Sequence, residues 1–409
     1  MKSISRIIAE GRGNYITPRS VQDAIPIRRI YDDGMILTGN YFTKTLRFSD
    51  INYSSASEND RERLFIAQAQ LINSLPDLEY TKLTIFNRPV GRTDQAKKTE
   101  IPDRTDGLKE YRDELQAYVS SNVTTDTVVQ DKYLTIGINE KDPETARAYL
   151  AKETAAIRTG LDALGSEMEE VGIRDRLRIF HDFYNPYSVS TYSFDYDDTL
   201  KRGHSFKDYI APDSFSFRSS YFMMGELYGR VLVMRTYGSS VRDEMVSFLT
   251  QRSRIMMLSA DFYPIPTAQA RQLVDRKLLG AETSKTKWQK RQNENSNFSA
   301  EPPFELQQQI DELREMLDDL MNRDQKMIMT TLTIVHLAKS REELDADTEE
   351  LQNAANRFSC NLGTLMYQQY EGLNTVLPFG GKIGIYAQRT FTTECACCVT
   401  MPFSAKILQ

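Results

Sequence analysis

The sequence predicts an α+β fold made of two related units, each a mostly antiparallel sheet covered by helices on one face. Short runs with apolar residues at every second position predict strands, and longer runs with apolar residues every three or four positions predict helices. Both kinds of run occur in roughly the same order in each half: hairpin, helix, strand, helix, strand and helix. A variant of the ferredoxin-like arrangement fits this order.

The first half begins with a hairpin over residues 27–39, because the turn pair Asp33-Gly34 separates two β-prone runs. Extended chain continues over 41–48, and Ser57 is expected to cap a helix that Pro76 ends. The other elements expected here are a strand over 80–87, a polar and basic loop over 88–104, a helix over 107–119, a strand around 134–138 and a long helix that begins at Asp142.

The second half repeats the pattern from a hairpin over residues 221–235 onward. We expect Gly280 to end a helix over 268–279, because glycine weakens helices. The other elements expected here are a helix over 241–249, a strand over 255–263, a helix over 304–323, a strand over 327–337, a charged helix over 341–357 and extended chain over 361–367.

A connecting segment is expected between the two halves. Residues 185–220 are rich in Tyr, Phe, Ser and Asp and show no clear period, which is typical of a long functional or docked loop. The sequence therefore predicts a first unit over 1–175, a connecting segment over 176–220 and a second unit over 221–409.

Composition indicates a folded protein with a sizeable core. Of the 409 residues, 40 % are apolar and 26 % are charged, and the net charge of −6 argues against wholesale binding of nucleic acid. The longest apolar stretch, residues 327–338, is too short to span a bilayer, and the first residues lack the apolar core of a secretory signal. We therefore expect a cytoplasmic location.

The cysteines invite the question of a metal site. Three of the four lie close together, but they do not form the paired spacing of structural zinc sites, and no histidine lies near them in sequence. We expect reduced thiols in a packed element and no bound metal. The cysteines are Cys360, Cys395, Cys397 and Cys398.

No nucleotide-binding or catalytic residue can be assigned. The phosphate-binding pattern GxxxxGK followed by Ser or Thr is absent, and the nearest fragment, residues 380–383, lacks its upstream glycine. Residues 195–200 (DYDDTL) resemble the first motif of haloacid-dehalogenase-type phosphotransferases, which would use Asp195 and Asp197. That chemistry needs the motif at the end of a buried parallel strand, and the preceding residues do not read as one, so a solvated acidic loop is favoured.

Two further features have a structural and a functional interpretation. The basic residues around Trp288, the only tryptophan, are compatible with single-strand nucleic-acid binding, but an exposed helix with one packed anchor, or a protein interface, is favoured. His336 lies in an apolar run and is expected to be a hydrogen-bonded core residue.

The chain from about residue 177 onward resembles the CagE/TrbE/VirB-type ATPases of conjugation and type IV secretion, especially those of mobile genetic elements. The most specific part is residues 373–380 (LNTVLPFG), followed by RTFTTE at 389–394 and MPF at 401–403. The other segments that carry the resemblance are residues 204–217, 221–232, 288–303, 323–327, 331–351 and 367–372.

The resemblance implies an amino-terminal docking and assembly region that precedes a RecA-like motor. ATP and Mg²⁺ would belong to that motor, and this chain would have no catalytic role. The implied partners are inner-membrane channel subunits and its own motor domain, with homo-oligomers in the full-length form and a peripheral location at the inner face of the cell membrane. Direct nucleic-acid binding is not expected. Candidate partner or interdomain contacts are Trp288, Tyr370, Leu377 and Phe379.

Two alternatives stay open from the sequence. The chain is also compatible with a stand-alone adaptor that has no motor, and with a phosphotransferase that uses the acidic cluster Asp195, Asp197 and Asp198.

Overall fold

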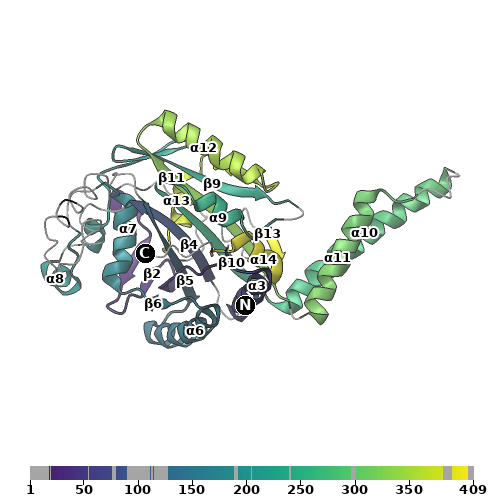
Figure 1. Cartoon of the computed structure of the whole chain (residues 1–409), viewed down its shortest axis with the longest axis horizontal. Coiled ribbons are helices and arrows are strands. Elements are labelled where there is room, and N and C mark those ends of the chain that lie inside the picture. Colours follow the sequence, from purple (N-terminus) through teal and green to yellow (C-terminus); the bar gives the residue numbers. More distant parts are fainter. Residues whose placement is uncertain are drawn as a thin grey trace.

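A computed structural model describes most of the chain, and all statements below refer to these residues. They are 18, 20–53, 55–75, 80–89, 111, 114, 128–187, 192–203, 205–238, 241–295, 301–323, 325–380 and 389–403. Of the helix expected over 107–119, the structure describes only residues 111 and 114, both of which are helical. Most of the basic loop expected over 88–104 and residues 381–383 of the glycine fragment lie outside the described residues. The predicted α+β class is confirmed by one large, open, antiparallel sheet with helices packed on it (Figure 1).

The first half contributes one run of strands and helices. Its elements are α2 (Val21–Ala24), β1 (Ile27–Ile30), β2 (Ile36–Thr38), β3 (Tyr41–Phe48), α3 (Glu58–Ser74), β4 (Tyr80–Pro89), β5 (Val128–Asn139), α6 (Pro143–Leu164), β6 (Met168–Glu170) and α7 (Ile173–Tyr184).

The second half contributes a longer run. Its elements are α8 (Tyr196–Arg202), η2 (Phe206–Tyr209), β7 (Phe215–Phe217), β8 (Phe222–Met224), β9 (Leu227–Thr236), α9 (Met245–Thr250), β10 (Met256–Ile265), α10 (Thr267–Glu294), α11 (Phe304–Asn322), β11 (Met327–Ala338), α12 (Arg341–Asn356), β12 (Asn361–Thr364), α13 (Gln369–Val376), β13 (Arg389–Thr392) and α14 (Thr393–Thr400).

The two halves have the same strand order, and the sheet runs through both. The main path is β1-β2-β3-β5-β4-β10-β11-β9-β8-β7. From the outer edge inward, the first half runs β1, β2, β3, β5, β4 and the second half runs β7, β8, β9, β11, β10, so the two orders correspond strand by strand. The short strands β6 and β12 pair with β3 and β9, which hold equivalent places. The central pair is β4 with β10, antiparallel from Met256 opposite Asn87 to Phe262 opposite Thr81. The halves are therefore joined by a ladder of backbone hydrogen bonds.

Helices cover both faces of the sheet, and not one face as the sequence predicts. The helices α3, α6, α9, α12 and α14 pack on the face to which Leu83, Leu134 and Leu258 point. The helices α7 and α13 pack on the opposite face, against Phe86 and Val335. Successive residues of a strand point to opposite faces of the sheet. In these strands the residues that point to either face are largely apolar, so each face carries a core.

Local sequence signals explain several element ends. Ser57 accepts a hydrogen bond from the Asp60 backbone N–H and acts as the predicted helix cap. Asp142, where a helix was expected to begin, accepts one from the Thr145 backbone N–H and caps α6. The turn of the first hairpin uses Gly34 at φ 81°, where a Cβ would lie 2.4 Å from the Val171 carbonyl oxygen. Only glycine fits this left-handed position so close to a neighbouring strand.

Three further predictions need correction. Gly280 does not end its helix, because Ala281 is buried in the packing with α11 and the helix continues to Glu294. The segment 185–220 is not a featureless connection, since it includes α8, η2 and the edge strand β7. The boundary expected at residue 175 falls inside α7.

The helices α10 and α11 form a hairpin that extends away from the sheet, and we call it the arm (Figure 1). It is inserted between β10 and β11, which pair along ten residues at the centre of the sheet. At its base, Ala270 and Val274 pack with Ile265 and Met327 in one apolar cluster. The arm is therefore attached to the middle of the body through two neighbouring strands.

Candidate functional site

A buried ion pair lies where the two halves meet. Lys82 on β4 and Asp261 on β10 are register partners, with Nζ and Oδ1 2.9 Å apart and both side chains almost fully buried. The Tyr80 hydroxyl donates to the same Oδ1 at 2.9 Å, and Lys82 also donates to the Thr375 carbonyl of α13. Burial lowers the pKa of Lys82 and raises that of Asp261, while their mutual attraction opposes both shifts. The pair thus links both halves to α13.

Residues 377–380, which we call the clamp, follow α13 and close over the first half. The ring of Phe379 stacks on Phe180 of α7, with centroids 4.5 Å apart and an 11° angle between the planes. The Phe379 carbonyl accepts hydrogen bonds of 3.1 Å from the hydroxyls of Thr38 and Thr43. Gly380 has φ 78°, and a Cβ there would lie 2.2 Å from Cγ2 of Thr43. The clamp therefore requires glycine at its end and contacts the first half directly.

Arg176 supports the clamp from α7. Its Nη1 donates to the carbonyls of Gly34, at 2.9 Å, and Thr43, while Nη2 donates to the Thr43 hydroxyl at 2.7 Å. Burial lowers the pKa of this guanidinium to about 9. Arg176 thus holds the first hairpin and β3 in the position that receives Phe379.

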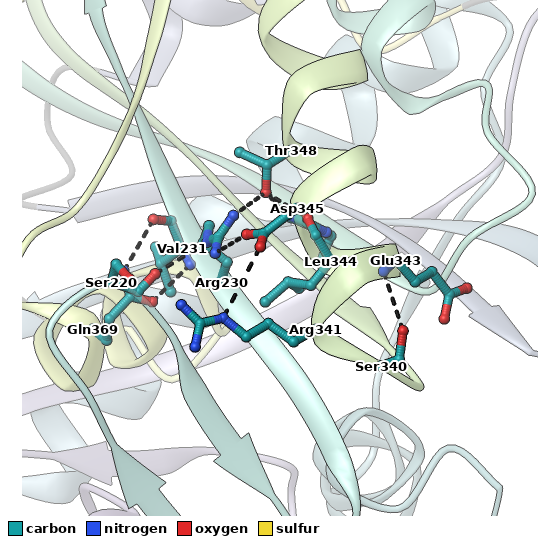
Figure 2. Close-up of polar contacts among 11 residues, drawn as sticks. Ser220, Arg230, Val231, Ser340, Arg341, Glu343, Leu344, Asp345, Thr348 and Gln369 are labelled. Atoms are coloured by element: carbon teal, nitrogen blue, oxygen red, sulfur yellow. Dashed lines mark hydrogen bonds and ion pairs between the residues drawn. The ribbon is translucent and has the colours of Figure 1, made fainter.

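A second polar centre lies in the second half, around Arg230 of β9 (Figure 2). Its Nε donates to the Ser220 carbonyl at 3.0 Å, Nη1 to the Thr348 hydroxyl at 2.8 Å, and Nη2 to Asp345 at 2.6 Å. Figure 2 shows Asp345 and Thr348 reaching Arg230 from the same side of α12. The guanidinium therefore fixes α12 to β9 and to the start of β8.

Gln369 anchors α13 on the same strand. Its side-chain oxygen accepts from the Val231 N–H at 2.9 Å (Figure 2). Its amide donates to the Leu365 carbonyl at 2.6 Å. Two consecutive residues of β9 are thus bound to different helices: Arg230 contacts side chains of α12, and the Val231 backbone contacts a side chain of α13.

His336 sits opposite Arg230 in the strand register and is fully buried. Its Nε2 is 3.1 Å from the Thr348 hydroxyl, whereas Nδ1 has no hydrogen-bond partner among the described residues. Burial, together with the charges of Arg254 and Arg230, lowers its pKa to about 3. The predicted core position is confirmed, and the ring is neutral at neutral pH.

The four residues predicted as contacts lie in three places. Leu377 and Phe379 are fully buried and belong to the contact between the halves, while Tyr370 packs edge-to-face on Phe217 with centroids 5.3 Å apart. Trp288 is half-buried on the arm, far along the chain from the other three. The structure therefore does not bring the four together into one surface.

The acidic and cysteine clusters form no converging set. Asp195 precedes the short helix α8, and Asp195 and Asp197 are exposed, so the motif starts a helix and does not follow a parallel strand. The three clustered cysteines lie on α14 and face different directions, with Cys395 exposed and Cys397 buried. Among the described residues, no group of three or more metal-binding side chains converges on one point.

The sequence does not signal the central polar residues by motif or spacing. Lys82, Asp261, Arg176 and Arg230 are single charges in otherwise apolar or mixed runs, and the side chains that they contact lie more than a hundred residues away. The one available signal is a charged residue in an element that is largely buried, on a strand for Lys82, Asp261 and Arg230 and on the helix α7 for Arg176.

Comparison with known proteins adds no relative. No family model matches the chain, and no curated protein matches it. Among the described residues, each helix is too short or too polar to cross a lipid bilayer.

Proposed function

We propose that this chain is the docking and assembly region of a conjugative type IV secretion ATPase, which binds channel subunits at the inner face of the membrane. ATP and Mg²⁺ would be bound by the motor that follows in such proteins, because this sequence lacks the phosphate-binding pattern. The proposal is supported by the resemblance of the sequence segments to that family and by the places that these segments take in the structure.

The most specific of these segments occupy joints between elements. Residues 373–380 complete α13 and form the clamp against the first half. Residues 389–394 form β13, paired with β11, and begin α14. Phe403 packs edge-to-face on Phe48 of β3, with centroids 5.8 Å apart. Segments that join a body together suit a positioning role better than a catalytic one.

The last described helix is attached to both halves, and this observation carries the proposal. The helix α14 packs against α3 of the first half and against α9 of the second. Cys397 lies in the apolar cluster that contains α3 and α6, and Val399 lies in the one that contains α9 and α12. A motor domain connected through this helix would move with the whole body, so a docked body fixes the position of the motor.

The test is recovery of the chain with its partners. Affinity-tagged protein, in its natural full-length context and in donor cells, should co-purify with inner-membrane channel subunits after mild detergent extraction. The purified 409-residue chain should not hydrolyse ATP. Recovery of the full-length protein without any channel subunit, from cells in which the channel is assembled, would contradict the docking role. The adaptor alternative predicts the same partners but no motor in the natural protein.

A further inference from the structure

The arm projects from the body, and its two helices pack mainly against each other (Figure 1). Their shared core is narrow, with Ile310 and Leu313 of α11 against Ala281 of α10 at its centre. Three large apolar side chains of the arm point outward: Leu279 is 67 % exposed, Phe304 80 % and Met321 53 %. An exposed helical pair with apolar side chains on its outside is suited to bind another helical surface.

The two helices carry opposite charge. The helix α10 has seven basic and three acidic side chains, a net charge of +4. The helix α11 has one basic and six acidic side chains, a net charge of −5. Only part of this charge is neutralised within the arm, by contacts such as that of Arg314 with Glu282 at 2.8 Å.

The unneutralised charges of opposite sign lie at the same level along the arm. Contacts of Lys285 with Gln307 and of Arg314 with Glu282 set the register between the helices. This register places Lys287, Lys290 and Arg291 level with the start of α11, which carries Glu305. All four are exposed, and none makes an ion pair with another described residue.

We infer that the arm binds the arm of a second copy of this chain. A two-fold axis parallel to the two arms places α10 of each copy against α11 of the other. Equivalent residues of the two copies then lie at the same height along the axis, so the register between basic and acidic residues is the same between copies as within one arm. The basic helix then faces the acidic helix twice, and the same patch serves both copies, as in an isologous dimer. The product is a four-helix bundle with charged flanks of the kind that select partners in coiled coils.

The alternating sign of the arm favours this occupant over others. A nucleic acid or an anionic lipid surface would attract α10 but would be repelled by α11, which lies beside it along most of its length. A second arm satisfies both helices at once and also covers outward apolar side chains. The inference does not depend on the proposed function, because it concerns self-association alone.

The first experiment measures the mass of the full chain by sedimentation velocity at micromolar concentration. We expect a dimer that dissociates as sodium chloride rises, because screening shortens from about 10 Å at 0.1 M to about 3 Å at 1 M salt. A wild-type chain that stays monomeric at low salt up to tens of micromolar would overturn the inference.

Charge exchange then tests the surface. The triple variant Lys287→Glu, Lys290→Glu, Arg291→Glu and the double variant Glu301→Lys, Glu305→Lys carry exposed charges at the same level of the arm, and each should weaken association on the order of 100-fold. An equimolar mixture of the two should restore a dimer, which also shows that both variants are folded. A mixture that stays monomeric would overturn the inference.

Controls separate the arm from other surfaces and ligands. The exposed acidic pair Glu342 and Glu349 on α12, changed to lysine, should leave the dimer unchanged. The wild-type chain and the basic-to-acidic variant are also tested for binding of single-stranded DNA and of phosphatidylserine vesicles. If the variant loses salt-sensitive binding to either ligand but keeps the oligomeric state of the wild type, the inference is overturned. A wild-type chain that dimerises but does not co-purify with channel subunits would instead count against the proposed function.

Discussion

Lys82 and Asp261 come from different halves of the chain and form an enclosed ion pair across the central strands, with Nζ and Oδ1 2.9 Å apart. Tyr80 donates to the same carboxylate, and α13 closes over the lysine through the Thr375 carbonyl. This arrangement couples the junction of the halves to the helix that precedes the clamp.

The change Asp261→Asn should lower the free energy of unfolding by about 3–5 kcal/mol, because it leaves a buried lysine without its counter-charge. Urea unfolding followed by circular dichroism measures this loss. The paired change Lys82→Met with Asp261→Leu removes both charges and should cost much less. Equal losses in the single and double variants would show that the ion pair is not the cause.

Acid should destabilise the protein partly through His336. Its pKa is about 3 in the folded protein, against about 6.5 in an unfolded chain, so the unfolded state binds more protons between these values. Stability from this group is full above pH 6.5 and falls as the pH drops, by about 2 kcal/mol at pH 5. The variant His336→Gln should lose this part of the pH dependence, measured as the difference in unfolding free energy between pH 8 and pH 5. Parallel pH profiles for both proteins would refute the assignment.

The clamp should not tolerate a side chain at residue 380. The change Gly380→Ala adds about 1–2 kcal/mol of left-handed backbone strain and about 1–3 kcal/mol from the clash with Thr43. Gly39→Ala is the matched control, because Gly39 has φ 60° and nothing within 4 Å of an added Cβ. Adding Thr43→Ser removes the methyl group that clashes most and keeps the hydroxyl, so it should recover part of the steric loss in thermal unfolding. If Gly380→Ala lowers the stability only as much as Gly39→Ala does, the clash between residue 380 and Thr43 does not contribute.

The packing of α14 can be read from thiol reactivity. Cys395 is exposed, whereas burial raises the pKa of Cys398 to about 11 and also raises the pKa of Cys397. Iodoacetamide at pH 8 should therefore label Cys395 first, roughly tenfold or more ahead of Cys397 and the buried Cys360. Peptide mass spectrometry gives the order, and labelling in guanidinium should make the rates similar. Early labelling of Cys397 in the native protein would mean that α14 is not packed between the halves.

Local signals were sufficient for much of the fold. Asp33-Gly34 predicted the first hairpin, and the caps Ser57 and Asp142 predicted two helix starts, because each depends on residues a few positions apart. Gly280 misled for the opposite reason, since the packing of the neighbouring Ala281 against α11 outweighs a weak local preference.

The candidate site was only partly predictable. Leu377 and Phe379 were expected to make a partner or interdomain contact, and they lie between the halves. The ion pair of Lys82 and Asp261 was missed, because it depends on β4 pairing with β10, which no local pattern encodes. The role of the arm residues around Trp288 stays a prediction that the charge-exchange experiment addresses.

The repeated strand order has a consequence for the history of the chain. Duplication and fusion of one ancestral half-length gene would produce such an arrangement, with the β4–β10 seam in the place of a former subunit boundary. Fusion makes the association of the halves independent of protein concentration. It would also free the two sides of the seam to diverge, so that a lysine on one side can pair with an aspartate on the other.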